Sequence, residues 1–504
     1  MDDTTSDTAG PDDRDLTASH GVVLRARNGD VIRYDPSGLV LRLSDRVLED
    51  IALRLPDRGA PAALAMAAAS PDLPEGIDAW DGRADGDWVT FTARLPGDQG
   101  VRGFRQHVDG GDILAETNGP VLGLLGLGGA RAALATRVPA RYPQHIVAPA
   151  DDIGAVGHAG VETAKHLDRL EHLREMTHEA LTAQTILDWR MADHGPLPLF
   201  VTRVETDASV TAADLACGQA VENLLVAAGN LKAASELMGK KAKVLAVTLD
   251  FSLEDHSTSA SSYRDGMLAT MEAVSQGLWD LGFDRPLFVA RFESGLPDVA
   301  PQPALDGQWE LSWSHGDHRL IHSAPAYMFA RDAYDRPTDA ARLQQAEMTA
   351  SAIAEAATWK CPTLHLAELE GTVLRVAARA AGPLTFEPHG PSGAAPQRPS
   401  GAAVHGASGA VAQGASGAAA YGGFALEGVN NGAEITGVRV AEDDPQSLLV
   451  DLSKVPEGAD MALCYATHGP GGLRDDWQLD SATGVTLHRW ALPARLPITG
   501  GRHA

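Results

Sequence analysis

Two carboxylate side chains, Glu254 and Asp255, come shortly after a continuous apolar segment, Val244–Phe251, and His256 is next to them. Carboxylates and a histidine beside serines can supply a general base and a nucleophile, or they can accept hydrogen bonds from hydroxyl groups. Because adjacent residues of an extended chain point to opposite sides, Asp255 and His256 are poorly placed to act on one substrate atom. We therefore expect no catalysis here, and we expect Glu254 either to be buried and hydrogen-bonded or to accept hydrogen bonds from ligand hydroxyl groups.

The segments around these residues predict an α/β crossover. The apolar segment has the length and the boundaries of a buried strand in a parallel sheet. An Ala/Leu-rich segment from Ala213, apolar at helical spacing, precedes it, and a second helix is expected from about Ser262. Ligands bind such sheets beyond the carboxyl ends of the strands, which is where the polar residues lie.

Four aromatic residues lie in or next to predicted loops, where an exposed ring can stack on the apolar face of a sugar. The alternative for each is an ordinary place in the core. With Glu254 and Asp255, they complete the predicted carbohydrate-binding set: Trp309, Trp313, Tyr327 and Trp477.

Three histidines, His315, His318 and His322, could share one face of a helix and bind a metal with Asp317. The alternation over Trp309–Trp313 instead favours strand and loop in this segment. We therefore predict neither a metal site nor a cofactor.

The order of these elements resembles the SGNH (GDSL-like) hydrolase superfamily, in particular its sialate O-acetylesterase-like branch and its versions in phage and gene transfer agent structural proteins. The residues that carry the resemblance are Ser252-Leu253-Glu254-Asp255 after the strand, Tyr263-Arg264 in the next helix, and the next strand, Arg285–Phe292. The resemblance covers roughly residues 122–355 and implies an α/β/α domain with a parallel sheet.

The catalytic residues that the resemblance implies are absent. The family's nucleophilic serine follows a strand in a Gly-x-Ser motif, and the counterpart here, Gly123–Gly129, places Leu125 at that position. The catalytic histidine precedes the last helix, and the corresponding segment places Arg336 there. A serine hydrolase needs a nucleophile and a base within hydrogen-bond reach. We therefore predict no catalytic residues and treat Leu125 and Arg336 as vestigial catalytic positions.

Composition excludes several classes of protein. The 504 residues carry a formal charge of −26, which argues against binding to a phosphate backbone. No apolar segment approaches the length of a membrane span, and the acidic N-terminal segment does not read as a signal peptide. The three cysteines, Cys217, Cys361 and Cys464, are far apart and odd in number, as expected for a chain made in a reducing cytoplasm.

Five regions are predicted along the chain. Residues 1–18 form a polar, disordered arm, and residues 19–118 form a β-sandwich-like attachment module with a hairpin at Asn28-Gly29 and a strand at Trp88–Leu95. Residues 119–385 form the SGNH-like domain. Residues 386–423 form a Gly/Ala/Ser linker, because this composition buries too little apolar surface to pack. Residues 424–504 form a C-terminal β-module.

The C-terminal module also resembles phage and gene transfer agent proteins, through Cys464-Tyr465-Ala466, the Gly-rich loop with Leu473-Arg474-Asp475, and the closing Trp490-Ala491 strand. Together the two resemblances imply a non-enzymatic head spike or fibre on the surface of a released particle. It would bind a bacterial surface polysaccharide and contact other particle proteins through the N-terminal module. Nucleic acid and membrane insertion are not expected, and a homo-oligomer is left open.

Two alternatives remain open at this stage. The chain could be an active carbohydrate O-acetylesterase whose catalytic residues lie in another register. It could also be a purely structural spike that binds no sugar. A serine and a histidine within hydrogen-bond reach would favour the esterase.

Overall fold

The computed structural model describes residues 73–74, 76–95, 100–136, 138–251, 259–293, 302–332, 336–391, 421–467 and 469–500, together with the backbone of strands at 22–25, 31–35 and 38–42. The chain divides into two compact units, one of residues 1–118 with 187–198 and one of residues 119–186 with 199–504. Each unit is described by itself.

The N-terminal unit contains two antiparallel sheets. The strands of the first are β1 (Val22–Arg25), β2 (Val31–Asp35) and β3 (Gly38–Arg42). Those of the second are β4 (Asp78–Asp85), β5 (Trp88–Arg94), β6 (Val101–His107) and β7 (Leu114–Ala115). Pairing of Arg25 with Val31 confirms the predicted hairpin, whose turn lies outside the described residues. Phe91 and Phe104 pair across β5 and β6 and form part of a small core, so the predicted half-buried strand is confirmed.

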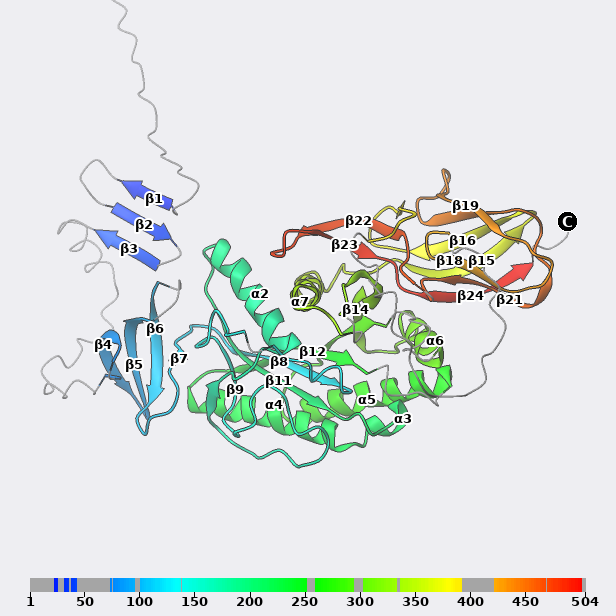
Figure 1. The fold of residues 1–504 in the computed structure, drawn as a ribbon. Helices are drawn as coiled ribbons and strands as arrows, with labels where there is room; N and C mark the ends of the chain where they lie inside the picture. Colours follow the sequence, from blue (N-terminus) through cyan, green and yellow to red (C-terminus); the bar gives the residue numbers. More distant parts are fainter. Residues whose placement is uncertain are drawn as a thin grey trace, which may run out of the picture. The chain divides into compact units, whose positions relative to one another are not determined.

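The second unit contains a seven-stranded sheet in the order β10-β9-β11-β8-β12-β13-β14 (Figure 1). Only β10 is antiparallel to its neighbour. The strands are β8 (Val121–Gly128), β9 (Ile146–Pro149), β10 (Leu170–His172), β11 (Leu199–Thr206), β12 (Ala242–Asp250), β13 (Leu287–Phe292) and β14 (Arg319–Pro325). From β11 to β14 the order is that of a doubly wound, flavodoxin-like sheet, whose switch point lies between β8 and β12.

Helices cover both faces of this sheet (Figure 1). They are α2 (His178–Ala192), α3 (Ala212–Leu215), α4 (Gln219–Leu237), α5 (Ala260–Asp280), α6 (Gln302–Leu311), the short 3₁₀ helix η1 (Ala326–Met328) and α7 (Asp339–Ala354). The predicted helix before β12, the strand itself and the helix after it are confirmed, and residues 252–258 lie outside the described residues. Ser259 caps α5 by accepting a hydrogen bond from the Ser262 amide, and Thr338 caps α7 in the same way through Ala341.

The glycines of β8 let helices approach the sheet closely. A Cβ atom at Gly123 would collide with Leu231 of α4, and one at Gly126 would collide with Glu179 of α2. These two glycines are an odd number of positions apart, so they face opposite sides of the strand. The glycine-rich pattern of this segment therefore follows from packing on both faces of the sheet.

The C-terminal part of the second unit is all β. Its seven-stranded sheet has the order β18-β21-β24-β15-β16-β20-β19, and a three-stranded sheet has the order β17-β22-β23. The strands are β15 (Thr363–Glu370), β16 (Val373–Arg379), β17 (Thr385–Phe386), β18 (Phe424–Val429), β19 (Ile435–Val440), β20 (Ser447–Leu452), β21 (Gly458–Tyr465), β22 (Leu473–Asp480), β23 (Thr486–Trp490) and β24 (Ala494–Gly500).

This β region corrects two sequence expectations. Strands β15 and β16 were assigned to the α/β domain, but they lie in one sheet with strands that follow the Gly/Ala/Ser tract. Residues 473–475, expected in a loop, begin β22. Residues 392–420 of the tract lie outside the described residues. The coarse fold class, mixed α/β with additional β regions, agrees with the prediction.

Buried polar contacts join the β region to the α/β domain. Glu347 of α7 accepts hydrogen bonds from the Ser481 hydroxyl at 2.5 Å and from the Ala482 amide at 2.8 Å. Tyr327 donates to the carbonyl of Ala491 at 2.7 Å, and its hydroxyl lies 3.2 Å from that of Tyr465. These contacts fix α7 and η1, both of which lie near the carboxyl ends of the central strands.

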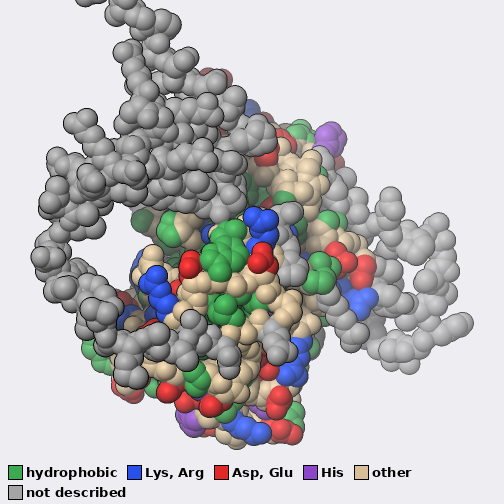
Figure 2. All heavy atoms as spheres, turned by 90° about the vertical axis from the view of Figure 1, so that its left-hand side faces the viewer, with side chains coloured by type: hydrophobic (Ala, Val, Ile, Leu, Met, Phe, Trp, Pro, Cys, Tyr) green, Lys and Arg blue, Asp and Glu red, His purple; other side chains and the backbone are tan. Residues whose placement is uncertain are grey.

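The described surface mixes charges of both signs. On the face that Figure 2 shows, acidic and basic side chains of the coloured residues are interspersed with apolar ones. None of the helices within the described ranges has both the length and the apolar character that crossing a membrane requires.

Candidate functional site

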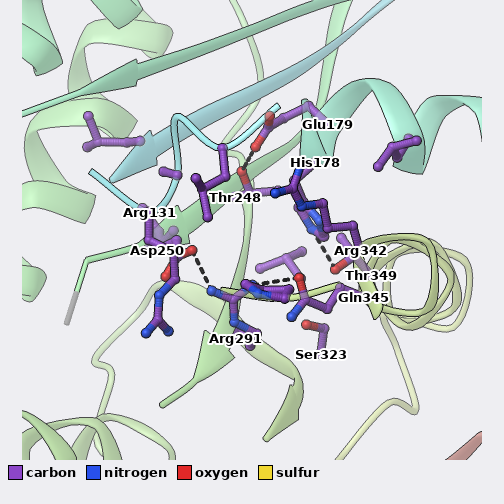
Figure 3. A pocket seen from close by; sticks show the side chains of 17 residues that line it. Arg131, His178, Glu179, Thr248, Asp250, Arg291, Ser323, Arg342, Gln345 and Thr349 are labelled. Atoms are coloured by element: carbon purple, nitrogen blue, oxygen red, sulfur yellow. Dashed lines mark hydrogen bonds and ion pairs between the residues drawn. The ribbon is translucent and has the colours of Figure 1, made fainter. Parts of the chain in front are cut away.

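A cavity of about 50 Å³ lies at the carboxyl ends of β8, β12, β13 and β14. This is the place where doubly wound sheets bind their ligands. The loop after β8, the first turn of α2 and one face of α7 complete its walls (Figure 3). Its polar lining consists of Arg131, His178, Glu179, Thr248, Asp250, Arg291, Ser323, Arg342, Gln345 and Thr349. The volume suits a few water molecules or one small substituent of a larger ligand.

Arg291 is held between a strand and a helix on one side of the cavity (Figure 3). Its guanidinium lies 2.6 Å from the Asp250 carboxylate and donates to the Gln345 side-chain oxygen at 3.1 Å. Asp250 is the last residue of β12, and Arg291 lies near the end of β13. These two contacts fix the direction in which the guanidinium points.

Glu179 is a buried carboxyl group at the start of α2, with 2 % of its surface exposed. One carboxyl oxygen lies 2.5 Å from the Thr248 hydroxyl, and the other is buried without a hydrogen-bond partner among the described residues. Burial raises the pKa of Glu179 above its ordinary value, against the opposing hydrogen bond from Thr248. The protein therefore favours the neutral acid, which can donate a hydrogen bond to a ligand.

His178 faces Thr349 across the cavity (Figure 3). Its Nε2 atom lies 3.0 Å from the Thr349 hydroxyl. Burial, reinforced by the nearby positive charge of Arg291, lowers the pKa of His178 to about 4. The imidazole is therefore neutral at physiological pH and is a weak base.

Arg131 and Arg342 bring further positive charge to the cavity. Arg131 forms an ion pair with Glu293, which is buried and also lies 3.4 Å from the guanidinium of Arg331. Arg342 donates to the carbonyl of Ala135 at 3.0 Å, and its Nε atom is buried without a partner among the described residues. The cavity thus combines several fixed guanidinium groups with the buried carboxyl group of Glu179, a set suited to binding a polar or anionic group.

The residues directly after β8 are Gly129, Ala130 and Arg131. None of these three carries a hydroxyl or thiol group, so this strand end lacks a nucleophile. Leu125, which the sequence placed at the nucleophile position, instead lies three residues before the end of β8 and is fully buried. Its assignment as a vestigial nucleophile position stays a prediction, and the glycines of β8, which repeat at short intervals, allow more than one alignment.

The other predicted positions fall in several places. Glu254 and Asp255 lie outside the described residues, as does His256, so their role in carbohydrate binding stays a prediction. Arg336 comes just before α7 as expected, but it is exposed and pairs with Asp332 at 3.0 Å. It does not line the cavity, although Pro337 next to it does.

The aromatic candidates do not form one site. Trp309 lies in α6, not in a strand or loop, and donates to the carbonyl of Leu364 at 2.8 Å. Tyr327 is buried and is therefore not an exposed stacking ring. Trp477 is half-buried in β22, where it contacts Trp359 and Arg489. Of the four candidates, only Trp313 is exposed, with 46 % of its surface accessible.

Several cavity residues were not singled out from the sequence. Arg342, Gln345 and Thr349 have the spacing i, i+3 and i+7 that places polar side chains on one face of a helix, and this signal was available in an otherwise Ala-rich segment. His178 and Glu179 gave no comparable signal, because only the fold brings the start of α2 to the end of β12. Among the described residues, no group of three or more His, Cys, Asp and Glu side chains converges as a metal site does.

Comparison with solved structures finds chains that are similar to this one. No family model matches the chain, and no curated protein sequence matches it. Among solved structures, the chain is similar to a carbohydrate acetylesterase from Xanthomonas citri, with 13% sequence identity and a TM-score of 0.47. The similarity covers 82% of this chain and 86% of that one.

Proposed function

We propose that this chain is a non-enzymatic carbohydrate-binding protein, a head spike or fibre on a phage-like or gene transfer agent particle. It attaches the particle to capsular polysaccharide on a bacterial surface. The observation that carries the non-enzymatic part is the end of β8, where Gly129, Ala130 and Arg131 occupy the place of a nucleophile. Arg131 is moreover held in an ion pair with buried Glu293.

The chemistry of the cavity supports binding without turnover. Asp250 and Gln345 hold Arg291 in place, and the low pKa of His178 makes its imidazole a weak acceptor of a proton in a reaction. Fixed groups of this kind bind a polar substituent with little loss of conformational entropy. The cavity takes a carboxylate or acetyl substituent of a glycan, and the sugar ring stays outside it.

The particle role rests on the two sequence resemblances, one in the α/β domain and one in the C-terminal β region. The N-terminal unit, with its separate antiparallel sheets, is suited to contact with other proteins of the particle. Through this unit the chain is held on the particle surface, and the second unit faces the polysaccharide.

One observation favours the alternative, an active carbohydrate esterase. The His178 imidazole and the Thr349 hydroxyl lie within hydrogen-bond distance in the cavity, as a base and a nucleophile would. The low pKa of His178 opposes this role, because a general base works best with a pKa near the working pH. Substitution Thr349→Val separates the two functions. An esterase would lose acetate release in this variant, whereas a binding protein would keep its retention on the glycan.

Sedimentation with cells tests the proposed function. Labelled protein is mixed with encapsulated bacteria and with a capsule-free mutant of the same strain, and the pelleted fraction is measured. We expect pelleting only with encapsulated cells and no loss of capsule acetyl groups. Pelleting that is equal with both strains, or absent with both, would contradict attachment to the capsule and leave a structural role.

A further inference from the structure

A second depression, of about 250 Å³, lies between the α/β domain and the β region of the second unit. We call it the Trp313 groove. Trp313 and His315, which follow α6, line one part of it, and Lys360, His365 and Arg379 line another. The groove is separate from the cavity at the strand ends, because the two share no lining residue.

The ring of Trp313 is exposed but held in position. It packs edge-to-face against Trp309, with ring centroids 5.5 Å apart. Trp309 is itself anchored by its indole hydrogen bond to the carbonyl of Leu364. A fixed and exposed aromatic ring is a platform on which the apolar face of a sugar can stack.

The groove is positively charged in a chain that is strongly negative. Lys360 and Arg379 are exposed, and no ion pair or side-chain hydrogen bond joins either of them to another described residue. The lining contains no aspartate or glutamate, although the chain has 67 acidic residues against 41 basic ones. Two unpaired cations without a carboxylate beside them leave a place for an external anion.

Two histidines in the groove have unused hydrogen-bonding atoms. His315 Nδ1 and His365 Nε2 are buried and have no partner among the described residues. The pKa of His365 is lowered to about 4, by burial first and then by the charges of Arg379 and Lys360. The His365 imidazole is therefore neutral near pH 7 and can hydrogen-bond a sugar hydroxyl group. A buried nitrogen without a partner is costly unless a ligand or water satisfies it.

We propose that the Trp313 groove is a second saccharide-binding site, selective for acidic sugars that carry a carboxylate. Trp313 stacks on the sugar ring, Lys360 and Arg379 pair with the carboxylate, and His315 and His365 contact hydroxyl groups. This inference rests on the proposed carbohydrate-binding function and adds the chemical class of the glycan.

Calorimetric titration of the full chain with trigalacturonate and with its methyl ester tests the inference. The two probes have the same rings, and only the first carries carboxylates. We expect trigalacturonate to bind about tenfold more tightly, because the ester carries no negative charge to pair with the two cations. Binding of trigalacturonate should also weaken as the salt concentration rises.

Variants assign this binding to the groove. The double substitution Lys360→Gln and Arg379→Gln should weaken trigalacturonate binding about tenfold and leave the ester unaffected. Trp313→Ala should weaken both probes. As a control, the double substitution Lys241→Gln and Lys243→Gln removes the same charge from exposed positions at the start of β12. It should change the affinity for neither probe.

The outcomes separate this inference from the proposed function. Equal affinity for the two probes, or full affinity in the double groove variant, overturns the acidic-sugar site. Capsule-dependent pelleting without trigalacturonate binding also overturns the site and leaves the proposed function standing. Failure of both pelleting and saccharide binding overturns both.

Discussion

Arg131, the third residue after the end of β8, forms an ion pair with Glu293, the first residue after the end of β13. The pair joins the carboxyl ends of β8 and β13, which lie on either side of β12 in the sheet. Arg331 contacts the same buried carboxylate at 3.4 Å. Arg131, close to the end of β8, is thus held in a buried contact that joins two parts of the sheet.

The Glu293 carboxylate should be essential for stability. Substitution Glu293→Gln leaves the guanidinium groups of Arg131 and Arg331 beside an uncharged amide at a site where only 2 % of residue 293 is exposed. We expect a loss of about 3 kcal/mol in the free energy of unfolding, because one partner of a buried ion pair is removed. Urea denaturation measures this loss.

An exposed ion pair provides the control. Asp443→Asn breaks the contact with Arg375, where the Asp443 side chain is 67% exposed, and should cost less than about 1 kcal/mol. Equal losses for Glu293→Gln and Asp443→Asn would contradict a special role for the buried carboxylate.

His178 should make the protein sensitive to acid. Its pKa is about 4 in the folded protein against a model value of 6.5, so the unfolded chain takes up the proton at a higher pH than the folded one. The contribution of His178 to the free energy of unfolding is therefore fully present above pH 6.5. It falls by about 3 kcal/mol as the pH drops toward 4. His178→Gln should remove this part of the pH dependence in urea titrations. As a control, His389→Gln changes an exposed histidine and should keep the pH dependence of the wild type. If both variants showed the same dependence of stability on pH, His178 would not be its source.

Glu179 should act in the opposite direction. Burial raises its pKa, so the folded protein holds the proton more tightly than the unfolded chain does. The contribution of Glu179 to the free energy of unfolding is therefore fully present below its ordinary pKa. It is lost as the pH rises through the raised pKa. Relative to wild type, Glu179→Gln should therefore gain stability as the pH is raised from about 4.5 to 8. Chemical denaturation across this range checks the slope, with Glu272→Gln as an exposed control. A difference from wild type that is constant with pH would refute the raised pKa.

The acidic pair after β12 should contribute to glycan retention. Glu254→Ala with Asp255→Ala should weaken pelleting with encapsulated cells several-fold, because each carboxylate accepts hydrogen bonds from sugar hydroxyl groups. The unfolding midpoint should stay that of the wild type. Glu368→Ala with Glu370→Ala removes the same charge from exposed positions of β15 and should have no effect. Unchanged retention in the first variant would place the binding site elsewhere on the chain.

Local patterns predicted the strands and helices around the site well. The apolar segment at 244–251 corresponds to β12, and the helix expected from about residue 262 corresponds to α5. The spacing of apolar residues that distinguishes a strand from a helix can be read from a few neighbouring residues. Burial on both faces of a parallel sheet leaves a continuous apolar signal that needs no tertiary information.

Features that depend on distant residues could not be predicted in the same way. Strands β15 and β16 pair with partners beyond the Gly/Ala/Ser tract, and no local pattern records that pairing. Gly126 makes room for Glu179, which is far away in the sequence, and no neighbouring residue indicates that contact. Tyr327 is buried because Ala491 and Tyr465 cover its hydroxyl group. Each error concerns a contact between segments, not the type of a segment.

Acetate release from an O-acetylated capsular polysaccharide tests the central claim most directly. The polysaccharide is passed over the immobilised full chain, and bound glycan and free acetate are measured over the same hours. The account predicts that the glycan is retained with its acetyl groups intact and that free acetate stays at the level of a protein-free control. Acetate release that grows with the amount of protein and disappears in Thr349→Val would contradict it and identify an esterase.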